Sequence, residues 1–281
     1  MDQKETKKKR GGCLKVALIV LLVLVLLIAA AVFIWYKANE DKIKAVQKER
    51  NTTTCTGMTM PDFEAVTTDG EKVSLSSLMD GKDVTVVVLF ATWCGPCEKE
   101  FPFMDEVYKK YQDKMSMIAL DVDSLDSDKS AKEYADSHGL SFPVAYYPDG
   151  SIGSIKATAY PTTLVVDRNG KIGMHRIGSM PDEEIFEKIV TQFMGDDYKE
   201  TQVGYYTFAG IPGTEFSLTD EDGNESTYTV GEDSKCDVLT DKPHDFKVKV
   251  LRVPDGGEID GEGEMQSGVG STIVILPVKK K

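Results

Sequence analysis

Cysteine is scarce in this chain, which has only five in 281 residues. So few cannot form the dense disulfide framework of a small secreted scaffold, and each cysteine therefore needs its own explanation. Positive charge is also in deficit, since 33 Lys and Arg stand against 46 Asp and Glu and leave a formal net charge of -13. An acidic surface repels phosphate backbones, so we expect no nucleic-acid partner.

One long apolar run is present, at residues 16–36, and it contains no charged side chain. At about 1.5 Å per residue it matches a hydrocarbon core of roughly 30 Å, which predicts a single transmembrane helix. The basic cluster at 7–10 favours a cytoplasmic N-terminus at 1–15 and an extracytoplasmic body in the cell membrane. The alternative is a cleaved signal peptide, with Ala29 and Ala31 framing the cleavage site. Trp35 and Tyr36 suit a membrane interface and favour the retained anchor.

Residues 37–59 are predicted to be a spacer, because their mixed charges and threonines bury little apolar surface. From residue 60 to 197 the pattern changes. Continuous apolar runs at 84–90, 115–122 and 163–166 are typical of strands buried on both faces. Between or after these strands, the segments around 101–111, 129–138 and 185–193 are predicted to be helices from their residue spacing. The alternation predicts an α/β domain.

The chemistry is expected where the strongest strand ends, at Trp-Cys-Gly-Pro-Cys in positions 93–97. A helix is expected to start near Glu98, and its N-terminus would surround the sulfur of Cys94 with unpaired N–H groups and favour the thiolate. Cys94 is then the attacking nucleophile, and Cys97 is close enough to resolve the mixed disulfide. Pro96 stiffens the turn without costing a helical hydrogen bond.

Two other interpretations of the cysteine pair are weaker. A zinc site usually needs a second close-spaced pair, whereas the other cysteines and the three histidines are isolated in the sequence. A static structural disulfide gains little from closing a two-residue gap. We therefore predict a redox-active pair, with no metal and no cofactor.

The motif at 93–97, the Tyr-Pro-Thr-Thr segment at 160–163 and the Pro-Asp-Phe at 61–63 carry a family resemblance. They resemble the TlpA/ResA group of membrane-anchored bacterial thiol-disulfide oxidoreductases. The resemblance covers about residues 60–195 and implies a thioredoxin fold, in which helices flank a central mixed sheet. It does not extend beyond residue 195.

The resemblance also implies site residues. Pro161 matches the family's cis-proline, which lies beside the two sulfurs, and X-Pro bonds are those in which cis is inexpensive. The expected substrate contacts are Trp93, Gly95, Pro96, Tyr160 and Pro161. The residues expected to act in catalysis are Cys94, Cys97 and Glu100.

Glu100 matches an acid that lines the active-site cavity of the family and assists proton handling. Its alternative is a solvated first-turn acid, which the helix dipole would also favour. Ordinary thioredoxin has a buried Asp six residues before the first cysteine, where this chain has Val88, and that departure favours Glu100 or water as the proton carrier. A peroxiredoxin is disfavoured because Ala91 occupies the position where Thr is expected.

Residues 201–281 contain short strand patterns and an Asp222-Gly223 turn, which predict a small all-β, sandwich-like domain of unknown role. Its acidic loop at 254–270 is more typical of a solvated loop than of a calcium site. Cys13 lies before the apolar run, and we expect no function for it. Cys55 and Cys236 would both lie outside the cytoplasm, where they either form a structural disulfide or stay free.

The sequence thus predicts an extracytoplasmic, membrane-anchored thiol-disulfide oxidoreductase. Following the resemblance, it would reduce disulfides of exported proteins, with apocytochrome c as one candidate, and take electrons from a membrane partner. The same fold could instead oxidise its substrates, since direction depends on redox potential and partners. A third hypothesis is an envelope binding protein that acts through its β domain.

Overall fold

The computed structural model describes residues 55–200, 202–267 and 273–281. The predicted cytoplasmic N-terminus and the predicted membrane helix at 16–36 lie outside these residues. Over the part of the chain that is described, no helix is long and apolar enough to cross a membrane. All of these described residues belong to one compact unit.

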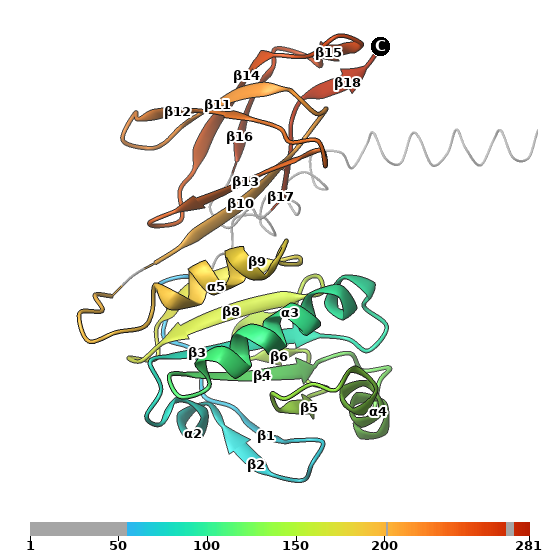
Figure 1. Ribbon diagram of the computed structural model, residues 1–281, viewed down its shortest axis with the longest axis vertical. Helices are drawn as coiled ribbons and strands as arrows, with labels where there is room; N and C mark the ends of the chain where they lie inside the picture. Colours follow the sequence, from blue (N-terminus) through green and yellow to red (C-terminus); the bar gives the residue numbers. More distant parts are fainter. Residues whose placement is uncertain (1–54, 201, 268–272) are drawn as a thin grey trace, which may run out of the picture. The chain divides into compact units, whose positions relative to one another are not determined.

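A five-stranded mixed sheet forms the core of the first part, in the order β5-β4-β3-β8-β9 (Figure 1). Strands β3, β4 and β5 are parallel, whereas β8 and β9 run antiparallel to their neighbours. This is the predicted mixed sheet. The elements of this part are β1 (Glu64–Val66), β2 (Lys72–Ser74), α2 (Leu75–Met79), β3 (Val84–Phe90), α3 (Gly95–Tyr111), β4 (Met115–Asp121), α4 (Asp128–His138), β5 (Val144–Tyr146), β6 (Ser151–Ile152), β7 (Ile155–Lys156), β8 (Thr162–Asp167), β9 (Ile172–Ile177) and α5 (Glu183–Thr191).

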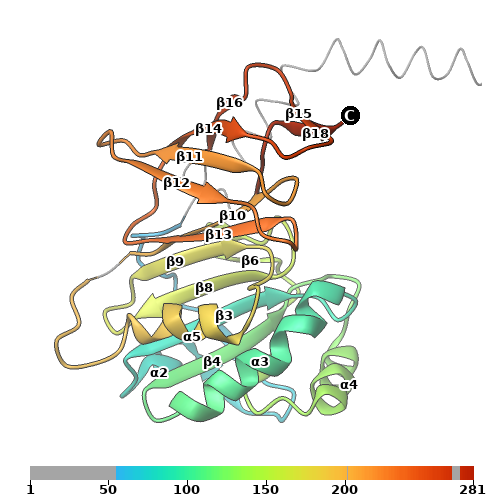
Figure 2. The ribbon, with the colours of Figure 1, turned by 45° about the horizontal axis from the view of Figure 1, so that its top comes forward.

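Both faces of the sheet are covered, which explains why β3 and β4 are apolar and buried along their whole length. Helices α3 and α5 run across one face (Figures 1 and 2), and α4 contributes Ala131 and Tyr134 to the same core. On the opposite face, α2 and the hairpins β1–β2 and β6–β7 enclose a second core. The cysteine pair belongs to the first of these cores.

Three local predictions need correction. Residues 55–59 were assigned to the spacer, yet Gly57 donates to the carbonyl of Ile172 at 2.7 Å and Cys55 is buried. The folded part therefore begins at or before residue 55. The alternation of Val73 and Leu75 with polar residues predicts a strand, but Ser74 caps a helix that starts at Leu75. Strand β9 had not been predicted, because His175 and Arg176 interrupt its apolar pattern.

The β region consists of two sheets around one core, as predicted for a sandwich. The sheets have the orders β13-β10-β17 and β12-β11-β14-β16, and both contribute side chains to the core. The short β15 pairs with β18. The strands of this region are β10 (Gly204–Ala209), β11 (Glu215–Thr219), β12 (Glu225–Thr229), β13 (Lys235–Thr240), β14 (Phe246–Arg252), β15 (Gly257–Ile259), β16 (Glu264–Ser267), β17 (Ile273–Ile275) and β18 (Val278–Lys280).

The border between the two parts is less sharp than the predicted division at residue 201. Val203 and Tyr205 pack into the core beneath α3 and α5, and the N–H of Val203 donates to the carbonyl of Gly173 in β9 at 2.7 Å. The start of the β region is thus built into the redox domain.

A disulfide between Cys55 and Cys236 is not formed, so the hypothesis of a structural pair is wrong. Both cysteines are free. Cys55 is buried in the core beside α2, whereas Cys236 packs against the core of the β sandwich. The two side chains pack in different cores, and their separation in the sequence could not show this.

Candidate active site at the start of helix α3

The cysteine pair lies where strand β3 passes into helix α3. Cys94 is the N-cap residue, in an extended conformation, and its sulfur accepts the backbone N–H of Cys97 at 3.2 Å. That N–H is one of those that a helix leaves unpaired in its first turn. Pro96 lies in the same turn, where a missing N–H breaks no helical bond. The helix N-terminus therefore favours a thiolate at Cys94.

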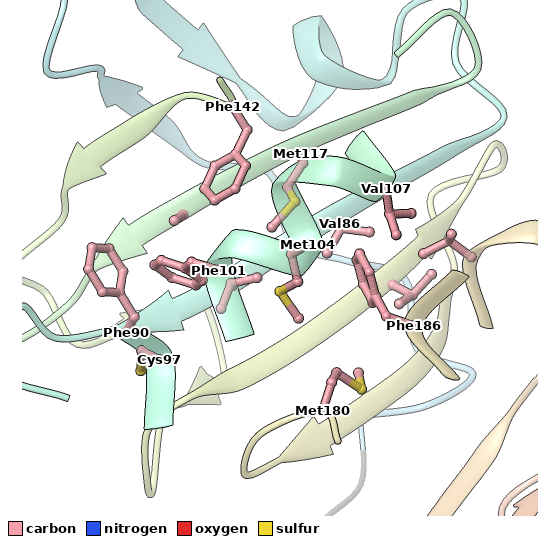
Figure 3. Close-up of a cluster of buried hydrophobic side chains, with 14 of the residues drawn as sticks. Val86, Phe90, Cys97, Phe101, Met104, Val107, Met117, Phe142, Met180 and Phe186 are labelled. Carbon is pink, nitrogen blue, oxygen red and sulfur yellow. The ribbon is translucent and has the colours of Figure 1, made fainter. Parts of the chain in front are cut away.

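The two sulfurs form a disulfide with an S–S distance of 2.10 Å and a Cα–Cα distance of 5.3 Å. Cys94 retains 3% of its surface exposed and Cys97 none. Figure 3 shows Cys97 at the end of the apolar cluster, near Phe90 and in the first part of the helix that also carries Phe101 and Met104. Of the two cysteines, only Cys94 therefore keeps any surface toward an approaching substrate.

The loop before β8 lies beside the cysteine motif. The peptide bond between Tyr160 and Pro161 is cis, as predicted. The Tyr160 ring meets the indole of Trp93 edge to face, with 5.8 Å between ring centroids, and Trp93 is 65% exposed. Gly95 and Pro96 are exposed as well. The five predicted substrate contacts thus lie on two adjoining segments, 93–96 and 160–161, with Trp93 and Tyr160 in direct contact.

Glu100 is fully buried in α3, one helical turn after Cys97. The interpretation as a solvated first-turn acid is therefore wrong. One carboxylate oxygen, Oε2, accepts the N–H of Met180 at 2.8 Å, while Oε1 has no partner among the described residues. Burial raises the pKa of Glu100 to about 8, against the lowering effects of the Met180 N–H and the nearby Arg176 charge. Such a group can exchange a proton near neutral pH.

Two acidic residues that the sequence analysis did not identify hold the motif in place. Asp123 accepts the indole N–H of Trp93 at 2.8 Å, and Asp126 accepts both the N–H and the hydroxyl of Thr92 at 2.9 and 2.6 Å. Both follow β4. Since β3 and β4 are parallel neighbours, their carboxyl ends meet at one edge of the sheet, and this topology would have pointed to them.

Asp121, the last residue of β4, is a second buried carboxyl near the motif. Its Oδ1 accepts the N–H of Asp123, and its Oδ2 has no partner within the described part of the chain. Burial raises the pKa of Asp121 to about 8, and the carboxylates of Asp126 and Asp123 add to the rise. Like Glu100, this side chain therefore holds its proton to higher pH than an ordinary carboxyl group.

The site contains the groups for disulfide exchange and proton transfer. Both sulfurs are engaged in the disulfide. Across the described ranges, no group of three or more His, Cys, Asp or Glu is arranged to hold a metal ion. The chemistry that the arrangement supports uses a thiol pair with a buried carboxyl behind it.

Part of this chain is similar in sequence to known proteins. A family model described as Redoxin matches residues 55–190. Thioredoxin-like protein YneN of Bacillus subtilis (strain 168) is 36% identical over 135 residues, which is 47% of this chain and 78% of that protein. Thiol-disulfide oxidoreductase ResA of Bacillus thuringiensis (strain Al Hakam) is 37% identical over 131 residues, which is 46% of this chain and 73% of ResA.

Among solved structures, a thiol:disulfide interchange protein of the thioredoxin family from Chlorobium tepidum TLS shares 29% identity. The match covers 51% of this chain and 99% of that one, with a TM-score of 0.42. The family match ends at residue 190, so it leaves out the β region.

Proposed function

The chain belongs to the Redoxin family and is a thiol-disulfide oxidoreductase of the ResA kind, and we propose that it reduces disulfides of exported proteins outside the cytoplasm. The observation that carries the proposal is the unequal placement of the two sulfurs. Cys94 is reachable at a helix N-terminus, while Cys97 is sealed in the core one turn before a buried carboxyl.

The reaction starts from the dithiol form of the pair. The Cys94 thiolate attacks one sulfur of the substrate disulfide, so a Cys94–substrate bond forms, the substrate S–S bond breaks, and the first substrate thiolate leaves and takes a proton. Cys97 then attacks the Cys94 sulfur and expels the second substrate thiolate. Two electrons pass from the pair to the substrate, which ends as two thiols, and the pair ends as the disulfide.

Glu100 is assigned to the second step. Cys97 must lose its proton before it attacks, and no solvent reaches it. The Glu100 carboxylate, one turn further along α3, can accept that proton and pass it on when the substrate leaves. With its pKa raised to about 8, it can hold or release a proton close to neutral pH.

The setting of Cys97 supports the reducing direction. A thiol in an apolar core beside a carboxyl gains little from ionisation, so the dithiol form is not stabilised by a Cys97 thiolate. With Cys97 un-ionised, the dithiol is less stabilised than it would be with two thiolates, and the pair is to that extent the better electron donor. A reduction potential near that of strong protein oxidants, about −120 mV, would overturn this direction.

The proposal places the catalytic part outside the cytoplasm, anchored by residues 16–36 and reduced by a membrane partner. Its support is the apolar run and the basic cluster before it. The side can be tested with Glu225→Cys in a chain whose other cysteines are replaced. A membrane-impermeant maleimide should label it in intact spheroplasts. Labelling only after permeabilisation would place the domain in the cytoplasm.

The decisive test of the substrate class is Cys97→Ser in cells. Without the resolving thiol, Cys94 should retain its substrates as mixed disulfides, which mass spectrometry of the captured adducts would identify as exported proteins, apocytochrome c among the candidates. Cys94→Ser serves as the matched control and should capture none. Adducts confined to cytoplasmic proteins would contradict the proposal.

A further inference from the structure

We propose that the β region is part of the redox machinery: it holds Arg176 in place, and Arg176 acts through the Ser179–Met180 peptide group to orient Glu100 and stabilise its carboxylate. Arg176 is thus a positioning residue. The inference rests on the proposed role of Glu100 as proton acceptor for Cys97, and it gives the β region a function that the family match does not cover.

Arg176 is a buried cation at the end of β9, with only 3% of its surface exposed. A buried guanidinium is costly unless it is hydrogen-bonded and near compensating groups. Its Nε and Nη2 atoms both donate to the carbonyl of Ser179, at 2.9 and 2.7 Å. This forked contact fixes the loop that connects β9 to α5.

The other contacts of Arg176 come from the β region. Its guanidinium stacks over the ring of Tyr205 in β10, 4.0 Å from the centroid, and Nη2 donates to the hydroxyl of Thr207 at 3.3 Å. That hydroxyl donates in turn to Asp237 of β13 at 2.6 Å. The β region therefore supplies an aromatic face, a hydroxyl and a carboxylate to a cation of the redox domain.

A single peptide group joins Arg176 to Glu100. The carbonyl of Ser179 accepts from Arg176, and the N–H of Met180, on the other side of the same peptide bond, donates to Glu100 Oε2 at 2.8 Å. The negative end of this peptide dipole faces the cation and its positive end faces the carboxylate. Hydrogen bonds in such a chain polarise and strengthen one another. Arg176 thus stabilises ionised Glu100 both by its charge and through the peptide.

The same loop also reaches the cis-proline. Gly178 has φ of +98, a conformation that favours glycine, and its N–H donates to the carbonyl of Pro161 at 2.8 Å. Within residues 178–180, successive groups therefore contact Pro161, Arg176 and Glu100. A change in the contacts between the β region and Arg176 would therefore alter the positions of both Pro161 and Glu100.

The charged and titratable groups that face Glu100 come from three elements. Arg176 of β9 lowers its pKa, Tyr134 of α4 lies near it as a buried neutral phenol, and Cys97 precedes it by one turn of α3. Arg176 itself is faced by Tyr205 and Asp237 of the β region, which favour its charged form. Removing the Arg176 charge should make Glu100 hold its proton to higher pH. Removing the Asp237 charge should have the opposite effect, because an anion that offsets Arg176 is lost.

The test measures the second step of exchange in the full chain, kept in detergent. The reduced protein is mixed with excess peptide disulfide and quenched in acid, and intact mass gives the decay of the mixed disulfide from about pH 5 to about pH 10, a range that spans ordinary carboxyl and thiol pKa values. Arg176→Gln should move the inflection of the rate to higher pH and lower the rate at pH 7 by roughly twofold to fivefold. Asp237→Asn, an exposed and isosteric change, should move it to lower pH. Arg176→Lys, which keeps the charge, should restore most of the loss.

Glu225→Gln is the matched control, since it removes an exposed carboxylate from β12, a strand of the other sheet. It should leave the profile of the wild type unchanged. If Glu100→Gln keeps the wild-type inflection, the proposed role of Glu100 fails. If Glu100→Gln abolishes the inflection while Arg176→Gln and Asp237→Asn do not move it, that role stands and the present inference is wrong. Should Arg176→Gln not fold, Asp237→Asn alone decides.

Discussion

Glu100 combines two properties that a surface acid never has together: it is completely buried, and only one of its oxygens has a partner among the described residues. Desolvation penalises the charged form, so its pKa rises from the usual 4.5 to about 8. The folded protein therefore retains a proton between these two pH values that the unfolded chain has released. By linkage, this group's contribution to stability is present below about pH 4.5 and is lost as the pH rises toward 8.

Glu100→Gln should remove the loss of stability that the ionisation of Glu100 causes as the pH rises. Relative to wild type, we expect the variant to be more stable at pH 8 than at pH 5, by a difference on the order of a few kcal/mol in the free energy of unfolding. Urea unfolding of both proteins at the two pH values measures it. His175 has a pKa lowered by burial to about 4 and acts in the opposite direction, but it is common to both proteins and cancels.

Glu106→Gln provides the control for this prediction, because Glu106 lies in the same helix, is exposed and pairs with Lys109, which stays charged over this pH range. Its relative stability should not depend on pH in this range. Equal losses of stability with rising pH in Glu100→Gln and wild type would show that Glu100 ionises normally in the folded state.

Residues that act through chemistry are easier to predict than residues that act through placement. Cys94 and Cys97 are predictable because thiols three positions apart at a helix start have few other uses. Asp123 and Arg176 were not predicted, because an acid after a strand and an arginine in a polar-looking strand are common in protein sequences. The role of Asp123 depends on Trp93, which is distant from it in sequence. The role of Arg176 depends on the Ser179 carbonyl, which it meets only because the chain turns after β9.

Helix α3 carries the active site, and its position depends on more than its apolar face. Asp105, buried in the middle of the helix, accepts the N–H and hydroxyl of Ser141 at 2.7 and 3.2 Å. Lys109, one turn later, pairs with the same carboxylate at 2.7 Å. These bonds fix the segment between α4 and β5 to the active-site helix.

Asp105→Ala should destabilise the fold by about 2–4 kcal/mol, because it leaves a backbone N–H of Ser141 without its partner and opens a buried site. The midpoint of urea unfolding, at unchanged slope, is the measurement. Glu106→Ala, on the exposed side of the same helix, should change stability by no more than about 0.5 kcal/mol. If Asp105→Ala also lost no more than about 0.5 kcal/mol of stability, the apolar face alone would position α3.

At the level of elements, the prediction succeeded where one pattern dominates. Strand β3 has the predicted bounds because an uninterrupted apolar run admits few alternatives. It was wrong at Leu75, where apolar alternation suggested a strand but the capping box of Ser74 and Ser77 starts a helix. Strand β9 was missed because Arg176 is buried by contacts with the β region, which no local pattern encodes.

At the scale of the whole molecule, the redox domain and the β region share structure at their border. Val203 and Tyr205 complete a core that otherwise belongs to the sheet and helices of the redox domain. The two remaining described cysteines lie in different cores. Cys55 is buried in the core beside α2, and Cys236 is half-buried at the edge of the β-sandwich core.

In a chain whose Cys13, Cys94 and Cys97 are replaced by serine, no disulfide should therefore form between Cys55 and Cys236. Intact mass of the unreduced, unfolded chain should show no two-hydrogen deficit, and the thiols of Cys55 and Cys236 should both be alkylated. In the folded protein Cys236 should react faster than Cys55, since burial raises the pKa of both thiols but only Cys236 is partly exposed. A deficit of two hydrogens would show that the two cysteines do meet.

The sequence by itself determined the redox domain: apolar strands, helical spacing and a cysteine pair at a strand end define an α/β thiol-disulfide oxidoreductase, because local patterns and short spacings carry that information. Only the tertiary structure decided what surrounds the sulfurs. Burial of Glu100, the contacts of Asp123 and Asp126 with the motif, and the contact between Arg176 and the β region bring together residues far apart in the chain. Their charge states depend on that burial, which sequence order does not encode.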